Sequence, residues 1–202
     1  MTGSKGLAHQ AKVLSEGQIK AALAAATSRD GYGARPERDA AMILLSVRGG
    51  LRAKEIASAT WSMVTGSDGE LTDTLALPNV ASKGRRGGRM VPLAQDLRRA
   101  LAALYGDGKP AGEHVVLDLR GQPMRPNTLA VWFRRLYAGL GFEGCSSHSG
   151  RRTAITRWAR GITTAGGSLR DVQDLAGHAD LSTTSRYIDQ NPDAQRRVVM
   201  LS

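Results

Sequence analysis

The sequence predicts a mostly α-helical domain with a small antiparallel β-sheet, an α+β fold. Three observations support this. Apolar residues recur at helical spacing through most of the 202 residues. Only residues 71–93 instead place β-branched and apolar residues on both sides of a turn, GRRGG. A chain of this length with 41% hydrophobic residues suffices for one sizeable core.

Three helices are predicted in the N-terminal part, after a loose polar tail at residues 1–14. The pair Ser15 and Gln18 has the pattern of a capping box and starts the first helix. The second starts at Pro36, which is favoured in a first helical turn, and ends at the Gly49-Gly50 pair. The third covers residues 52 to about 59.

The small sheet, at residues 71–93, is followed by helices at 95–104 and 127–138. The second of these has a one-sided apolar stripe, which indicates a core-facing helix. Three more helices are predicted in the C-terminal third. One follows His148, one is capped by Ser168, and one carries Tyr187 and is capped by Ser182.

Composition limits the compartment and the partners. The only cysteine, Cys145, excludes an internal disulfide and favours a reducing compartment. The N-terminus has no apolar stretch typical of a signal peptide, and the apolar runs are too short to cross a bilayer. We therefore expect a cytoplasmic, nucleoid-associated protein without a membrane partner. The net charge of +10 favours a polyanion, above all nucleic acid.

Four short stretches carry candidate chemistry: GLRAKE (50–55), SKGRRGGR (82–89), HSGRR (148–152) and GHADLSTTSRY (177–187). Each alone is weak, since arginines and lysines are usually solvated and a lone tyrosine is usually structural. Their order and contexts together resemble the tyrosine recombinase or phage integrase family, over residues 15–190. GLRAKEIASATW is similar to its first arginine box, ASKGRRGGRMVPL to its lysine hairpin, and HSGRRTAITRWA with SLRDVQDLAGHADLSTTSRYI to its second arginine box and nucleophile region.

The resemblance implies the family's catalytic-domain fold and six catalytic residues: Arg52, Lys83, His148, Arg151, His178 and Tyr187. Elementary chemistry agrees with this set. A tyrosine ordinarily has a pKa of about 10, so its attack on a phosphodiester needs assistance. Guanidiniums are always charged and fork-shaped, which suits the negative charge that builds on the phosphate oxygens. Because His148 and Arg151 are three residues apart, one helical turn can direct both at the same phosphate.

The resemblance also implies that Lys83 protonates the leaving 5′ oxygen and that a 3′-phosphotyrosyl intermediate forms and is resealed without ATP. We expect no cofactor and no metal, because arginines take the place of a Lewis acid and the histidines and cysteine lack zinc spacing. Arg85, Arg86, Arg89 and Arg152 are candidate DNA-binding residues. Double-stranded DNA is the expected partner.

Family members usually carry an additional N-terminal domain that closes around DNA. Only 51 residues precede Arg52 here, so we expect residues 15–190 to be a catalytic domain alone. Whether an accessory DNA-binding protein supplies the clamp is left open. The resemblance implies a homo-tetramer on two DNA sites. The tail at 191–202, with apolar residues 198–201, is expected either to dock on a neighbouring subunit or to fold back on its own domain.

Two other functions stay open at this point. A type IB topoisomerase uses similar groups and would relax DNA without strand exchange. A non-catalytic DNA-binding regulator could share the same fold, although all six catalytic positions hold competent residues. The sequence leaves the DNA target and the choice among integration, excision and inversion open.

Overall fold

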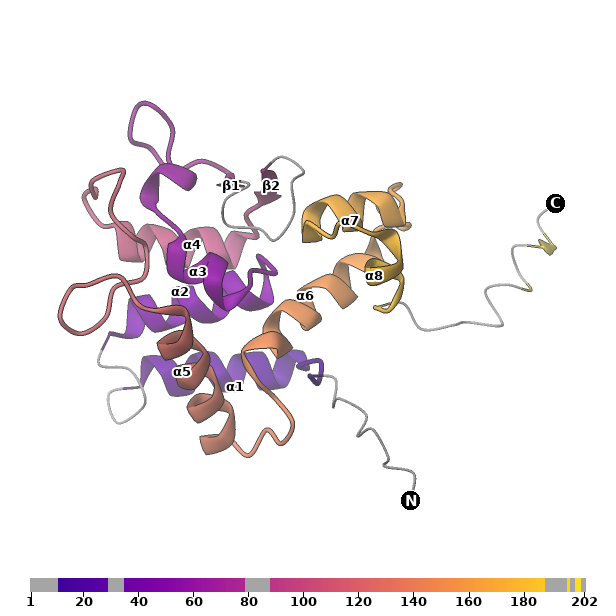
Figure 1. Ribbon diagram of the computed structural model, residues 1–202, viewed down its shortest axis with the longest axis horizontal. Coiled ribbons are helices and arrows are strands. Elements are labelled where there is room, and N and C mark those ends of the chain that lie inside the picture. The colour runs from indigo at the N-terminus through magenta and orange to yellow at the C-terminus, as the bar shows by residue number, and fades with distance from the viewer. Residues whose placement is uncertain (1–10, 29–34, 79–87, 188–195, 197–198, 201–202) are drawn as a thin grey trace, which may run out of the picture. The chain divides into compact units, whose positions relative to one another are not determined.

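The computed structural model describes residues 11–28, 35–78, 88–187, 196 and 199–200 (Figure 1). The chain divides into two compact units, Met1–Ala154 and Ile155–Ser202. Over the described residues it is mainly helical, with one two-stranded antiparallel sheet, which confirms the predicted fold class. None of the helices in these ranges has the length and apolarity that a membrane crossing requires.

The first unit is built around one central helix. Helix α2 (Pro36–Val47) is buried along most of its length, because apolar residues occupy every position from 41 to 45. It contacts α1 (Glu16–Thr27), α3 (Ala53–Ser58) and α4 (Gln95–Tyr105), and α3 also contacts α5 (Pro126–Gly139). Predicted positions of all five helices agree with the structure to within about two residues.

The capping box at α1 is confirmed. Ser15 Oγ accepts a hydrogen bond from the Gln18 N–H at 3.2 Å, and the Ser15 N–H donates to Gln18 Oε1 at 2.9 Å. The predicted loose tail, however, extends too far. Leu14 is only 2% exposed, and its N–H donates to Thr153 Oγ1 at 2.8 Å. Burial of this one apolar side chain ties the segment just before α1 to the domain.

The predicted sheet is formed by β1 (Thr74–Leu77) and β2 (Arg89–Pro92), which lie side by side in Figure 1. Leu77 pairs with Arg89 at the hairpin end, and Thr74 pairs with Pro92 at the other end. A 3₁₀ turn, η1 (Trp61–Met63), contacts β1. The hairpin that carries Lys83, Arg85 and Arg86 lies outside the described residues.

The second unit begins within α6 (Ser147–Gly161), which crosses the boundary between the units, and continues with α7 (Leu169–Ala176) and α8 (Leu181–Ser185). Its small core is formed by Ile155, Ala159, Val172 and Ala176, with Tyr187 packed against it.

Two details of the C-terminal prediction are wrong. Asp180, not Ser182, precedes the first residue of α8, so the predicted cap is two residues too late. Tyr187 lies in the turn that follows α8, where its N–H donates to the Thr184 carbonyl at 3.0 Å. Ser and Thr residues fill this helix and compete for its backbone groups, which explains why it is so short.

Candidate functional site

The first predicted arginine box lies at the start of α3. Arg52 immediately precedes this helix, and its backbone N–H donates to Glu55 Oε2 at 2.8 Å. Its Nη1 donates to Oε1 of the same carboxylate at 2.9 Å. Glu55 therefore satisfies a backbone donor that the helix start leaves open and also holds the guanidinium. The Arg52 side chain is 35% exposed.

Glu55 is the centre of the site, and sequence reasoning did not single it out. Its side chain is fully buried. Besides Arg52, it binds Arg89, whose Nη1 and Nη2 donate to Oε1 and Oε2, both at 2.9 Å. A fork-to-fork pair of this kind is among the stronger hydrogen-bonded pairs in proteins. The one sequence feature that indicates its role is its position, as an acidic residue inside the GLRAKE stretch.

Arg151, from the second predicted box, reaches the same carboxylate. It lies on α6, its side chain is 7% exposed, and Nη1 is 3.8 Å from Glu55 Oε2. Nη1 also donates to the carbonyl oxygen of Gly50 at 2.6 Å, two residues before Arg52. The structure thus brings together Arg52 and Arg151, which are 99 positions apart in the sequence.

The arginines determine the charge state of Glu55. Burial alone would raise the pKa of this carboxyl group, but the hydrogen bonds and charge of Arg89 oppose that effect. The Arg52 N–H and the charge of Arg151 act in the same direction, and the net result is a pKa below the ordinary value. Glu55 is therefore ionised at neutral pH, and the three guanidiniums surround a permanent negative charge.

Arg89, a candidate DNA-binding residue, is paired inside the protein. Its side chain is 8% exposed and its guanidinium is bound to Glu55. The reason is the strand: β2 begins at Arg89, so its side chain is held at the base of the hairpin and not at its tip.

The remaining predicted residues of the first unit lie on the first turns of α6. His148 is exposed, and Arg152 is half-buried. Gly150 is buried against α2, and a Cβ at this position would collide with Ser46. The glycine therefore permits a close approach of the two helices.

His178 and Tyr187 lie in the second unit. Their rings stack, with centroids 5.7 Å apart and planes at 23°. His178 Nδ1 forms a hydrogen bond with the hydroxyl of the fully buried Thr184 at 2.9 Å. Gln173 holds the loop before α8, because its Nε2 donates to the carbonyls of His178 and Ala179 at 3.0 and 3.2 Å. Thr184 and Gln173 were not singled out from the sequence.

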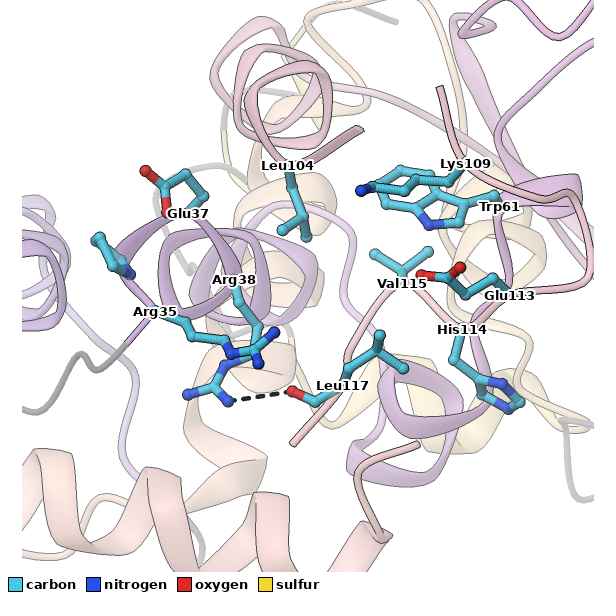
Figure 2. Close-up of a pocket in the computed structure, with 11 residues that line it drawn as sticks. Arg35, Glu37, Arg38, Trp61, Leu104, Lys109, Glu113, His114, Val115 and Leu117 are labelled. Atoms are coloured by element: carbon cyan, nitrogen blue, oxygen red, sulfur yellow. Dashed lines mark hydrogen bonds between the residues drawn. The ribbon is translucent and has the colours of Figure 1, made fainter. Parts of the chain in front are cut away.

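A separate pocket of about 330 Å³ opens in the first unit (Figure 2). Its charged lining residues are Arg35, Glu37, Arg38, Lys109 and Glu113, and Trp61 and Leu104 are among its apolar walls. Arg38 Nη1 donates to the Leu117 carbonyl at 3.1 Å on one side of it. None of the predicted site residues lines this pocket.

Comparison with known proteins identifies a family. The model of the phage integrase family matches residues 12–194. Tyrosine recombinase XerC of Bradyrhizobium diazoefficiens is 32% identical over 154 residues, which cover 74% of this chain and 45% of the relative. Tyrosine recombinase XerD of Vibrio cholerae is 31% identical over 188 residues, which cover 87% and 56% of the two chains.

A likeness in fold extends to solved structures. The Tn1549 transposon integrase, solved in complex with transposon right end DNA, superposes with a TM-score of 0.71 at 18% identity, over 96% of this chain and 67% of that one. The chain spans about half the length of the XerC and XerD relatives. From the matched model and these relatives, the chain belongs to the phage integrase family.

Proposed function

We propose that this chain is the catalytic domain, residues 15–190, of a site-specific DNA recombinase that cleaves and rejoins DNA through a 3′-phosphotyrosyl intermediate. One observation carries the proposal: Arg52 and Arg151, distant in the sequence, converge on the buried carboxylate of Glu55. Family membership supports the same conclusion.

The arginines would bind the scissile phosphate. Arg52 is the more exposed of the two, and Arg151 is held by Gly50 and Glu55. Fixed guanidiniums stabilise charge on the non-bridging oxygens without a rearrangement during the reaction, and this form of stabilisation is usually the largest in such sites. His148, three residues before Arg151 on α6, would assist at the same phosphate.

Tyr187 would supply the nucleophile. Its phenolic oxygen forms a bond to phosphorus, its proton passes to a base, for which His148 is our candidate, and the bond from phosphorus to the 5′ oxygen breaks. His178 would donate a hydrogen bond to a phosphate oxygen, and its contacts with Thr184 and the Tyr187 ring hold the imidazole in place.

Lys83 would give a proton to the departing 5′ oxygen. Resealing reverses these steps: a 5′-hydroxyl attacks the phosphotyrosine, and the phenol leaves. Because the covalent intermediate keeps the energy of the phosphodiester, the scheme needs no ATP. The guanidiniums take the place of a metal Lewis acid.

Double-stranded DNA is the proposed substrate, and four copies on two duplexes are the proposed assembly. The solved complex of the related Tn1549 integrase with transposon end DNA supports a DNA substrate. Arg85, Arg86 and Arg152 would contribute phosphate contacts. We further propose that the C-terminal tail, in which Val199 and Met200 are 71% and 86% exposed, docks on a neighbouring copy. If deletion of residues 191–202 leaves assembly on DNA unchanged, the tail does not dock.

Covalent trapping tests the proposal. Nicked duplex DNA, which loses the attacking 5′-hydroxyl after cleavage, should accumulate as a protein–DNA adduct that survives denaturation. Tyr187→Phe lacks the nucleophilic oxygen and should form no adduct while still binding DNA. If the wild-type chain forms no adduct on a library of DNA sites, the recombinase proposal fails in favour of a DNA-binding regulator.

The same adducts also discriminate against topoisomerase activity. Sequencing of the attached DNA should yield a limited set of sites for a recombinase. Efficient relaxation of a plasmid without such a site would favour the topoisomerase alternative.

A further inference from the structure

Arg89 stands apart from the other two arginines at Glu55. It comes from a β-strand, its guanidinium contacts both carboxylate oxygens, and its side chain is 8% exposed. Arg52, in contrast, uses one side-chain nitrogen on Glu55 and keeps 35% exposure. We infer that Arg89 is a positioning residue, which neutralises Glu55 so that Arg52 and Arg151 keep their charge for the phosphate. This inference rests on the proposed function.

The charges of the cluster explain why a third arginine is needed. Three guanidiniums surround one carboxylate, so these four side chains together carry a net charge of +2, which favours a bound anion. Attack of a deprotonated tyrosine on a singly charged phosphodiester gives a transition state with two negative charges. Without Arg89 only one positive charge is left over. The buried carboxylate would then draw both catalytic guanidiniums toward itself and would repel the phosphate.

The geometry assigns the roles in the same way. Arg89 makes the bidentate contact at 2.9 and 2.9 Å, whereas Arg151 Nη1 is 3.8 Å from Glu55 Oε2. Among the arginine side chains, Arg89 thus makes the most hydrogen bonds to the carboxylate, two against one from Arg52. Glu55 still orients Arg52 through the 2.9 Å contact between Nη1 and Oε1.

A direct phosphate contact by Arg89 is the competing explanation, and salt dependence separates the two. Each phosphate contact contributes about 0.9 to the slope of log affinity against log salt concentration on duplex DNA. Removal of a phosphate-binding arginine therefore lowers both the affinity and the slope. Removal of a positioning arginine leaves the slope unchanged and slows cleavage of the bound DNA.

The test uses Arg89→Gln, Arg89→Lys and the wild-type chain on the same nicked duplex. Binding is measured between 50 and 200 mM salt, and the adduct is followed in single-turnover experiments at saturating protein. Arg89→Gln should cleave the DNA about 10- to 100-fold more slowly than wild type. Loss of a donor that contacts the reacting group directly typically slows a reaction by about 100- to 1000-fold, so the expected effect is smaller. The salt slope of Arg89→Gln should equal that of wild type. Arg89→Lys keeps the charge but loses the fork-shaped guanidinium, so its cleavage rate should lie between those of Arg89→Gln and wild type.

Arg38→Gln is the matched control. Arg38 is equally buried, at 6% exposure, and is paired with Asp39, away from Glu55. Its loss reproduces the removal of a buried guanidinium, so melting temperatures of the two variants can be compared. Cleavage of bound DNA by Arg38→Gln should match wild type.

A double variant provides the sharpest readout. In Glu55→Gln/Arg89→Gln a neutral amide replaces the carboxylate. Cleavage by this double variant should be at least about threefold faster than by Arg89→Gln, as expected for coupled charges. A double variant no faster than Arg89→Gln, or a salt slope lower by about 0.9 in Arg89→Gln, would overturn the inference. Failure of the wild-type chain to form any adduct would instead count against the proposed function.

Discussion

Glu55→Gln gives the most direct test of the buried cluster, because it keeps the shape of a fully buried side chain while it removes the charge and one of the two acceptor oxygens. The carboxylate accepts four hydrogen bonds at 2.8 to 2.9 Å, from the Arg52 N–H, Arg52 Nη1 and both Nη atoms of Arg89. An amide keeps one acceptor oxygen, and its NH₂ group would face two of these donors. Two bonds to a charged group, worth about 1.5–3 kcal/mol each, are lost. We expect a loss of about 3–5 kcal/mol in unfolding free energy, as for other broken buried pairs.

The measurement is urea unfolding followed by circular dichroism at pH 7. Glu70→Gln is the control, because Glu70 is exposed and the chemical change is identical. It should shift the unfolding free energy by less than about 0.5 kcal/mol. A loss in Glu55→Gln that is as small as the loss in Glu70→Gln would refute the assignment of Glu55 as the centre of the cluster.

The pH dependence has a definite sign. The pKa of Glu55 is lower in the folded chain than its ordinary value of 4.5. Its ionised form therefore stabilises the fold above the unfolded pKa, and this contribution is lost as the pH falls through the folded pKa. The difference in unfolding free energy between wild type and Glu55→Gln should be constant near neutral pH and should become smaller below pH 4.5. A gap that widens on acidification would contradict the sign of the shift.

Three further substitutions test neighbouring features. Gly150→Ala should destabilise the fold in urea unfolding, because overpacking against Ser46 costs about 1–3 kcal/mol while the gain in helix propensity is about 1 kcal/mol. A second substitution, Ser46→Gly, should restore the stability of this variant. Thr184→Val should slow adduct formation about tenfold through the lost bond to the imidazole, whereas Thr183→Val should not; equal rates would remove Thr184 from the site. Ser15→Ala should lower the unfolding free energy by about 1 kcal/mol, and an unchanged midpoint would exclude the cap.

Local chemistry made most of the fold predictable. The capping boxes at Ser15 and Ser168 depend on residues three positions apart, and both occur in the structure. The apolar stripe at 127–138 predicted the buried face of α5 for the same reason. Boundaries were less predictable where hydroxyl side chains compete with the helix, as around Thr184.

The candidate site was predictable only in part. Arg52 and Arg151 stand out through the resemblance of their surroundings to a family, and the structure brings them together. Glu55 did not stand out, because an acid three residues after an arginine usually forms an ordinary surface pair. Its importance depends on Arg89, 34 positions away, and such a partner leaves no local pattern.

The hydrogen bond from Arg151 to the Gly50 carbonyl closes a loop of 101 residues. Contacts of such long range form late, because the entropy of closing the intervening chain must be overcome first. While the protein is being synthesised, a nascent chain that ends before residue 151 lacks one of the two guanidiniums that we propose to bind the phosphate. The proposed cleavage of DNA therefore requires both the synthesis of residue 151 and the contact of its side chain with Gly50.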